Sequence, residues 1–182
     1  THDLVLSLDA DEALSPELRT SITEVKNNPS ADGYSFNRAT FFCGKHIKHC
    51  GWYPDVSLRL WNRNKGTWGG YNPHDRFILQ ENCTVKHIEG DLLHYSYYTI
   101  NEHVVQCSKF STISANSKFK NGKRSSLFKI IVYPFWKFVK DYFLRRGFLD
   151  GYYGFVISMN SAHEVFQKYA KLKELEESQP NR

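Results

Sequence analysis

Hydrophobic and polar positions follow strand periodicity and then helix periodicity near the start of this 182-residue chain. Residues 4–8 form a short, almost continuous apolar run, which is typical of a strand buried on both faces of a parallel sheet. Ser15 and Pro16 supply an N-cap and a first-turn proline, and the apolar spacing that follows predicts a helix ending before Asn28. The acidic residues between the two elements therefore lie in a loop at the carboxyl end of a strand.

The middle of the chain reads mostly as strands and turns. Aromatic residues recur at even positions over 34–42, and apolar and polar residues alternate over 56–61, which is the two-residue period of a strand. Two more short strands are predicted at 83–88 and 92–97, separated by a turn at Glu89-Gly90.

After Asn101 the pattern becomes helical. A polar, basic stretch at 118–126 reads as a mobile loop, and residues 135–143 place their apolar side chains on one helix face, opposite Lys137, Lys140, Asp141 and Arg145. A last helix is predicted to open at Ser161 with a capping box. The longest apolar stretch is too short to cross a bilayer, which takes roughly 20 residues.

Charge is uneven along the chain, although the formal net charge is only +5. Nine Lys and Arg residues fall between Lys118 and Arg146, and Asp141 is the only acidic residue among them. An anionic partner would be attracted to this segment. The four cysteines form no Cys-x-x-Cys pair and indicate reduced thiols in a cytosolic compartment.

Asp9 and Asp11 alternate just past the first predicted strand, where open α/β sheets bind their ligands. Carboxylates so placed suit Mg²⁺ or Mn²⁺, which is commonly held by one or two acids and completed by the phosphates of a substrate. The alternative is a solvated loop whose acids favour the start of the helix at Pro16. Taken alone, the pair is too short a motif to decide between them.

The longer string from Leu6 to Leu18 resembles the DxD segment of family 2 glycosyltransferases, especially the branch that extends lipopolysaccharide inner cores. Further motifs of that branch follow in their usual order, and an ordered series is more specific than any one motif. They are Phe42-Cys43-Gly44-Lys45, His49-Cys50-Gly51-Trp52-Tyr53-Pro54-Asp55, Leu58-Arg59-Leu60-Trp61, Trp68-Gly69-Gly70, His74-Asp75 and Leu93-His94-Tyr95-Ser96-Tyr97.

The resemblance implies an α/β, glycosyltransferase-A fold, of which this chain is the C-terminal portion: a mixed sheet followed by C-terminal helices. Residues 1–100 would form the metal-, donor- and acceptor-binding part, and residues 101–182 a helical region. The implied reaction is an inverting transfer of a sugar from a nucleotide-diphosphate donor, such as UDP-glucose, to a lipopolysaccharide or other lipid-linked glycan. Such an enzyme would be cytoplasmic, with peripheral contact at the inner face of the membrane.

The same resemblance assigns roles to particular residues. Asp11 would bind the metal that bridges the donor diphosphate, and Asp9 the ribose or a metal-bound water. Asp75 stands where the branch usually has glutamate and would be the general base, unless it is a turn acid paired with Arg76. His94 would be a metal or phosphate ligand, or else a structural strand histidine. Arg59 would bind diphosphate, or else form a surface ion pair.

The resemblance also implies that something is missing upstream. Family members carry a nucleotide-binding strand and helix before the DxD segment, whereas this chain begins at Thr1, three residues before its first apolar run. We therefore expect the chain alone to have little or no activity.

Two other segments invite further interpretations. Cys43, His46, His49 and Cys50 invite a zinc site, but their spacing matches no common finger and the transferase motifs account for the segment. The aromatic, basic segment from Lys118 to Phe148 could contact a membrane surface, or its apolar face could simply pack on the sheet.

A basic nucleic-acid-binding module is the alternative function from another class. It leaves Asp9, Asp11 and Asp75 without a role, so no nucleic acid is expected as a partner. A non-catalytic protein that keeps the transferase fold is a third possibility.

Overall fold

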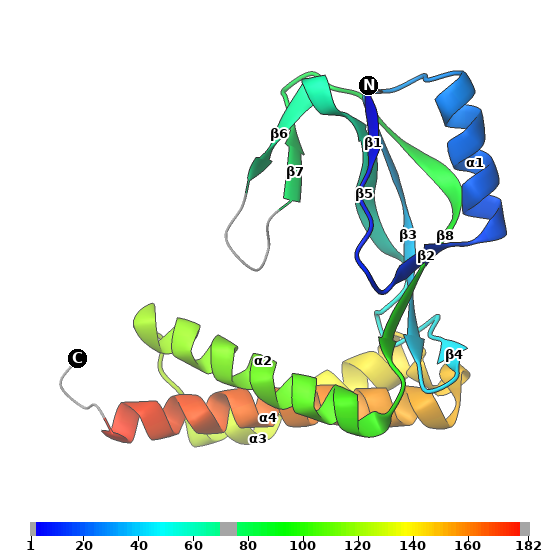
Figure 1. The fold of residues 1–182 in the computed structure, drawn as a ribbon. Coiled ribbons are helices and arrows are strands. Elements are labelled where there is room, and N and C mark those ends of the chain that lie inside the picture. The colour runs from blue at the N-terminus through cyan, green and yellow to red at the C-terminus, as the bar shows by residue number, and fades with distance from the viewer. Residues whose placement is uncertain (1–2, 70–75, 179–182) are drawn as a thin grey trace. The chain divides into compact units, whose positions relative to one another are not determined.

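The computed structural model describes residues 3–69 and 76–178, which divide into two compact units (Figure 1). Unit 1 comprises the described residues within 1–40 and 53–96, and unit 2 those within 41–52 and 97–182. The helical unit thus includes the short segment 41–52 in addition to the C-terminal part that the sequence pattern marks. Strands combined with helices give the α/β class that the sequence predicts.

Unit 1 is built on a sheet in which the strands follow the order β1-β5-β3-β8-β2, with α1 and a separate β6-β7 hairpin. The pairings β1 with β5, β3 with β5 and β2 with β8 are all antiparallel. The elements are β1 (Leu4–Leu6), β2 (Glu12–Leu14), α1 (Pro16–Asn27), β3 (Gly33–Phe42), β5 (Asp55–Asn62), β6 (Gly66–Gly69), β7 (Arg76–Leu79) and β8 (Val85–Tyr97).

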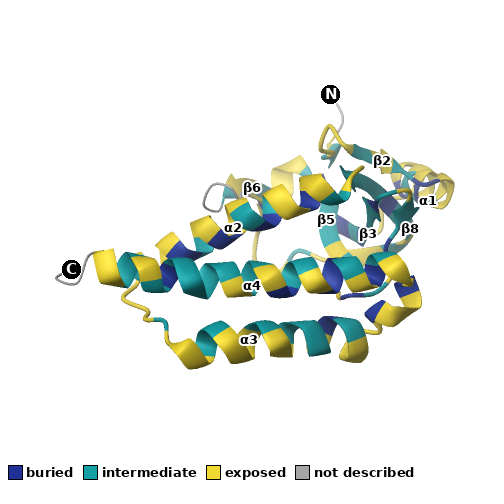
Figure 2. Cartoon of the chain, turned by 90° about the horizontal axis from the view of Figure 1, so that it is seen from below, coloured by how far each residue is buried: buried dark blue, intermediate teal, exposed yellow. Residues whose placement is uncertain are grey.

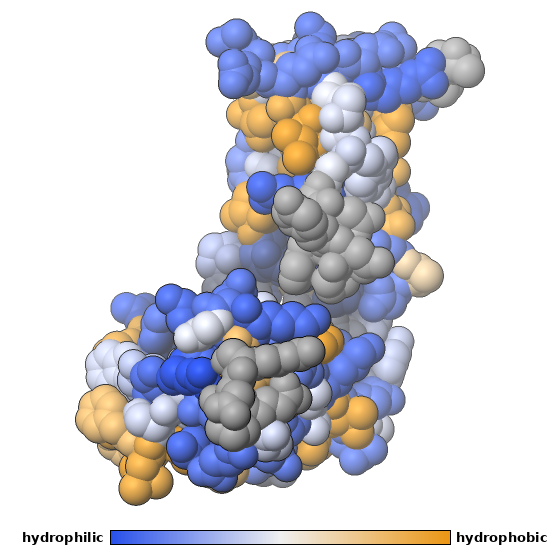
Figure 3. Space-filling model, turned by 90° about the vertical axis from the view of Figure 1, so that its left-hand side faces the viewer, coloured by the Kyte–Doolittle hydropathy of each residue, from blue (hydrophilic) through white to orange (hydrophobic). Residues whose placement is uncertain are grey.

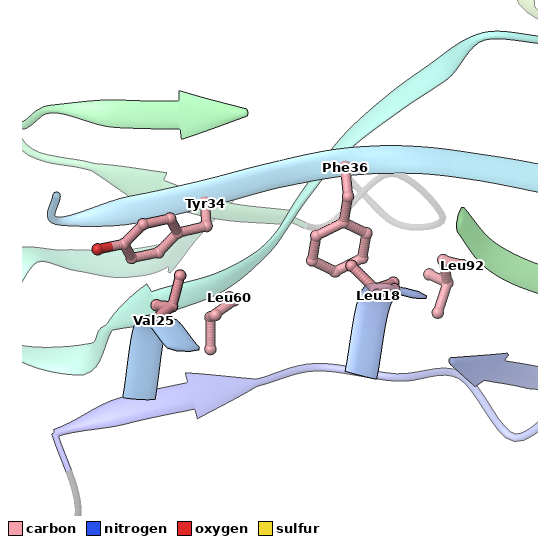
Figure 4. Packing of buried hydrophobic residues seen from close by; sticks show 6 residues of the cluster. All are labelled: Leu18, Val25, Tyr34, Phe36, Leu60 and Leu92. Carbon is pink, nitrogen blue, oxygen red and sulfur yellow. The ribbon is translucent and has the colours of Figure 1, made fainter. Parts of the chain in front are cut away.

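Helix α1 begins where its capping residues place it. The Ser15 hydroxyl accepts a hydrogen bond from the Leu18 amide at 3.2 Å, and Pro16 occupies the first turn. The helix then packs its apolar side against β3, β5 and β8, forming the core of this unit (Figure 4). The core residues are Leu18, Val25, Tyr34, Phe36, Leu60 and Leu92.

Two strand predictions for this unit are wrong. Of the run at 4–8, only residues 4–6 form a strand, β1. This strand is partly buried, and its neighbour β5 is antiparallel to it, so it is not a fully buried strand of a parallel sheet. The two short strands predicted around Glu89-Gly90 are one continuous strand, β8. Gly90 has φ +101°, and a Cβ there would lie 2.2 Å from the Leu18 nitrogen. Glycine thus lets the strand pass close to α1 instead of turning.

Unit 2 contains α2 (Ile100–Lys120), α3 (Leu127–Val139) and α4 (Tyr152–Ser178), with a π turn at Lys140–Leu144, a 3₁₀ turn at Gly147–Asp150 and the two-residue strand β4 (Lys45–His46). Helix α4 packs against both α2 and α3 (Figure 2). The core of unit 2 brings Phe42, Ile47 and Cys50 against Ile157 of α4. No helix in the described part of the chain combines the length and apolarity that crossing a membrane requires.

Helix boundaries in unit 2 differ from the sequence pattern at two places. Helix α2 continues to Lys120, so the predicted loop at 118–126 is shorter than expected. Helix α4 begins after Gly151, which makes Ser161 an interior helix residue and the predicted capping box wrong. A Ser-x-x-Glu spacing also occurs inside helices, and only the chain reversal at Gly151, with φ +65°, fixes the true start.

Candidate functional site

The acidic loop between β1 and β2 lies beside β8 because β2 pairs with that strand (Figure 1). In the antiparallel register Glu12 is opposite His94, and the Tyr95 amide donates to the Asp11 carbonyl at 2.9 Å. Two hydrogen bonds within the loop also close it on itself. The Glu12 amide donates to the Asp9 carbonyl, and the Asp9 amide donates to the Glu12 carboxylate. The loop therefore holds a defined conformation next to the histidine strand.

Asp11 and His94 are far apart in the sequence, but their side chains meet in the structure. Their side chains approach to 3.2 Å between Asp11 Oδ2 and His94 Nε2, and half of the Asp11 side chain is exposed. Burial lowers the pKa of His94, and the charge of Arg38 lowers it further, against the opposing effect of Asp11. The imidazole is therefore neutral at neutral pH, which is the form that binds a metal ion.

Arg59 connects Asp9 to Glu12. Its Nη2 lies 2.9 Å from Asp9 Oδ2 and 2.8 Å from Glu12 Oε1. The hydrogen bond from Arg59 lowers the pKa of Asp9, so this carboxylate stays ionised. Arg59 thus forms an ion pair, as its alternative interpretation predicts. Binding of diphosphate by Arg59 stays a prediction.

Sequence reasoning missed two residues of this cluster, Glu12 and Arg38. The Glu12 side chain is completely buried, and its Oε1 lies 3.7 Å from Arg38 Nη1 as well as close to Arg59. Arg38 also donates from Nε to Asp55 Oδ2 at 2.9 Å, across the β3–β5 pairing. Arg38 is the one charged residue within β3, and this was the available signal for it.

The cluster carries more negative than positive charge. Four carboxylates, those of Asp9, Asp11, Glu12 and Asp55, stand with two guanidinium groups, an excess of two negative charges when His94 is neutral. Within the described ranges, no three His, Cys, Asp or Glu side chains are grouped closely enough to hold a metal ion by themselves. Asp11 and His94 fit a cation that takes its remaining oxygen ligands from a substrate, as Mg²⁺ does with nucleotide phosphates.

Two other predicted sites have different outcomes. Asp75 lies outside the described residues, as do residues 70–74, so neither the general-base role nor the pairing with Arg76 is tested. In the rejected zinc segment, His49 Nδ1 lies 3.3 Å from Asp150 Oδ2, and the buried Cys50 thiol donates to the Gly154 carbonyl. These contacts connect the segment 41–52 to the 3₁₀ turn at 147–150 and to the start of α4.

Glu12 provides a test of how firmly the cluster holds the loop. Replacing Glu12 by glutamine is expected to lower the free energy of unfolding by about 2 kcal/mol. Removing one partner of a buried ion pair usually costs more free energy. Here each arginine retains another carboxylate partner, because Arg59 still pairs with Asp9 and Arg38 with Asp55. Urea unfolding followed by tryptophan fluorescence measures the change. Glu24→Gln, on the exposed side of α1, is the matched control, and an equal loss in both variants would contradict the prediction.

Comparison with curated proteins finds several relatives of similar sequence. Two uncharacterized glycosyltransferases, from Rickettsia typhi and Rickettsia prowazekii, are each 28% identical over 184 residues, covering 96% of this chain and 63% of the relative. A lipopolysaccharide core biosynthesis glycosyltransferase, LpsC of Rhizobium meliloti, is 27% identical over 172 residues, covering 91% of this chain and 62% of the relative.

These matches confirm the resemblance to glycosyltransferases, including the lipopolysaccharide branch, that the ordered motifs indicate. The chain spans a little under two thirds of the length of these relatives. No family model matches the sequence. No solved structure matches it significantly, so the resemblance comes from sequence and not from a shared experimental fold.

Proposed function

We propose, from the resemblance of this chain to glycosyltransferases, that it forms part of an inverting hexosyltransferase with a glycosyltransferase-A fold. The donor would be a nucleotide-diphosphate sugar such as UDP-glucose, and the acceptor a glycan of lipopolysaccharide or another cell-surface polysaccharide. The observation that carries the proposal is the contact of Asp11 with His94 beside a cluster of carboxylates and arginines built around the buried Glu12. Such an arrangement favours the interpretation of the acidic loop as a binding site for a metal-bound diphosphate over its interpretation as a solvated loop.

Each residue of the cluster has a part in the proposed reaction. Asp11 and His94 would hold a Mg²⁺ or Mn²⁺ ion, which neutralises the charge that grows on the departing diphosphate. Asp9, kept ionised by Arg59, would accept hydrogen bonds from the donor ribose or from a metal-bound water. Glu12 would keep Arg59 and the loop in place, because its carboxylate contacts both.

The acceptor side of the reaction is assigned to Asp75. Its carboxylate would take the proton from the acceptor hydroxyl while that oxygen bonds to the anomeric carbon and the bond to the diphosphate breaks on the opposite face. The configuration at the carbon is thereby inverted. Because aspartate is one methylene shorter than the glutamate usual in the branch, the acceptor must approach this residue more closely.

The location follows from the proposed acceptor. Because the Rhizobium relative is named for lipopolysaccharide core biosynthesis, we place the enzyme in the cytoplasm, at the inner face of the cytoplasmic membrane. The donor, a soluble nucleotide sugar, is available on that side.

Calorimetric titration with UDP-glucose tests the donor and the metal together. We expect binding in Mn²⁺ and a loss of affinity of about tenfold or more when EDTA removes the ion. Equal affinity with and without the ion would contradict the metal role. Salt-sensitive binding of single-stranded DNA, with no donor binding, would favour the nucleic-acid module instead.

The same titration tests whether the 182 residues suffice. Because they span less than two thirds of the relatives' length, we expect weaker donor binding and little transfer by this chain compared with a longer protein that includes upstream sequence. Comparable affinity in the two would refute this expectation.

A further inference from the structure

Helix α3 is strongly apolar, yet it buries none of its residues. Its exposed side chains follow the three- and four-residue spacing of a single helix stripe at 128, 131, 132 and 135, and exposed positions recur along the helix in Figure 2. The exposed fractions are 69% at Phe135 and 55% at Trp136. The exposed apolar side chains of α3 are Leu127, Phe128, Ile131, Val132, Tyr133, Phe135 and Trp136.

The one carboxylate of the same segment faces inward. Asp141 is only 1% exposed and pairs with Lys137 at 2.7 Å and with Arg145 at 3.2 Å. Of the two interpretations of this segment, the one in which its apolar face packs inward also takes the charges to be solvated, whereas Asp141 is buried. Phe138 and Tyr142 pack against Phe155 of α4 and are half-buried, whereas Phe135 and Trp136 remain exposed.

The apolar surface continues beyond α3 through a chain of ring contacts. Phe138 lies 6.3 Å from Phe143 and 5.8 Å from Phe155, and Tyr142 lies 6.3 Å from Phe148, between ring centroids. Phe143, Phe148 and Phe155 are each more than two fifths exposed. The exposed rings therefore form one surface that runs from α3 across the π turn to the first turns of α4.

Basic residues accompany this surface. Lys123, Lys140 and Arg146 are exposed near it, and the one acidic residue between Lys118 and Arg146 is the buried Asp141. In Figure 3 hydrophobic side chains gather at one edge of the helical unit, next to hydrophilic ones. Aromatic rings bordered by lysine and arginine are the composition that binds in the interface of an anionic bilayer.

We propose that this aromatic surface, formed by α3, the π turn and the start of α4, binds the headgroup region of a membrane that contains anionic lipid. The helix would lie in the plane of the interface, with Phe135 and Trp136 among the acyl chains and Lys140 and Arg146 at the phosphates. The inference rests on unit 2 alone and goes beyond the transfer reaction. Failure of donor binding would leave it standing, and the reverse also holds.

Vesicle co-sedimentation tests the surface directly. The chain is expected to sediment with vesicles of phosphatidylcholine and phosphatidylglycerol in equal parts, and much less with phosphatidylcholine alone. Phe135→Glu is expected to lower the partition coefficient by about tenfold or more, because one large ring is withdrawn and a negative charge added. Val85→Glu is the matched control, since this valine in unit 1 is 51% exposed and should leave partitioning unchanged.

A second readout separates insertion from electrostatic adhesion. Brominated acyl chains should quench Trp136 fluorescence, and the quenching should be lost in Trp136→Phe, which otherwise keeps the surface. Circular dichroism verifies that each variant is folded. No binding to the anionic vesicles, or equal binding by Phe135→Glu, would overturn the proposal. So would a dimer in solution that Phe135→Glu converts to a monomer, because a second copy would then cover the rings.

Discussion

Replacing Asp11 by asparagine is expected to lower the rate of sugar transfer by about a hundredfold or more in a protein that contains this chain and is active. Asparagine keeps the size of the side chain and removes the charge that, with His94, would hold the cation. Because the cation acts on charge that develops as the diphosphate leaves, kcat should fall more than the donor KM rises. Steady-state kinetics at saturating and limiting Mn²⁺ measure both quantities.

Two variants make the Asp11 result interpretable. Asp9→Asn should have a smaller effect, because Asp9 is tied to Arg59 at 2.9 Å and has only a supporting role. Asp3→Asn removes an exposed carboxylate of the same unit, 4.0 Å from Arg63, and should leave transfer unchanged. An Asp11→Asn enzyme with normal kcat, or one whose loss matches that of Asp3→Asn, would refute the assignment of the metal site.

The candidate site could be predicted from the sequence where the evidence was local or where motifs occur in series. Asp9 and Asp11 follow an apolar run, and His94 stands in a later motif of the same series. Glu12 and Arg38 could not be predicted as partners, because their contact depends on the order of β2, β8, β3 and β5 in the sheet. Strand order is a long-range property that periodicity does not contain.

The fold shows the same division between local and long-range information. Ser15 and Pro16 determine the start of α1 through contacts within a single turn, and the alternating pattern of 56–61 is sufficient to predict β5. The continuity of β8 depends on the close approach of Gly90 to Leu18, which are far apart in sequence. The sequence pattern around Gly90 therefore predicts a turn, whereas in the structure this glycine is the point where the strand contacts α1.

Helix orientation is a third kind of information that a pattern lacks. The segment 135–143 has the same periodicity whether its rings face a core or the outside, because periodicity defines a face without saying what lies against it. The structure decides this through Asp141, whose two cationic partners turn it inward. With that carboxylate buried, Phe138 and Tyr142 are half-buried, and Phe135, Trp136 and Phe143 are exposed.

Acidification is expected to destabilise unit 2 through His103, by about 3 kcal/mol between pH 6.5 and 4. This histidine is only 4% exposed and packs against Phe42, Trp52 and Tyr97, with ring centroids 5.3, 5.4 and 4.9 Å away. Burial lowers its pKa from 6.5 to about 4. In this interval the unfolded chain binds the proton more readily than the folded one, so stability is present above pH 6.5 and lost as the pH falls toward 4.

The effect of His103 is separated from general acid unfolding by comparing two variants across the same pH range. In His103→Gln no imidazole titrates, so the free energy of unfolding from urea titrations should fall less steeply with acid than in the wild type. Asn160→Ala removes the side chain whose Nδ2 lies 3.1 Å from His103 Nδ1 but keeps the titrating ring. It should lower stability at every pH and retain the wild-type slope. Parallel curves for the wild type and His103→Gln would show that another group is responsible, because only the loss of this buried imidazole removes the proton uptake that drives the change.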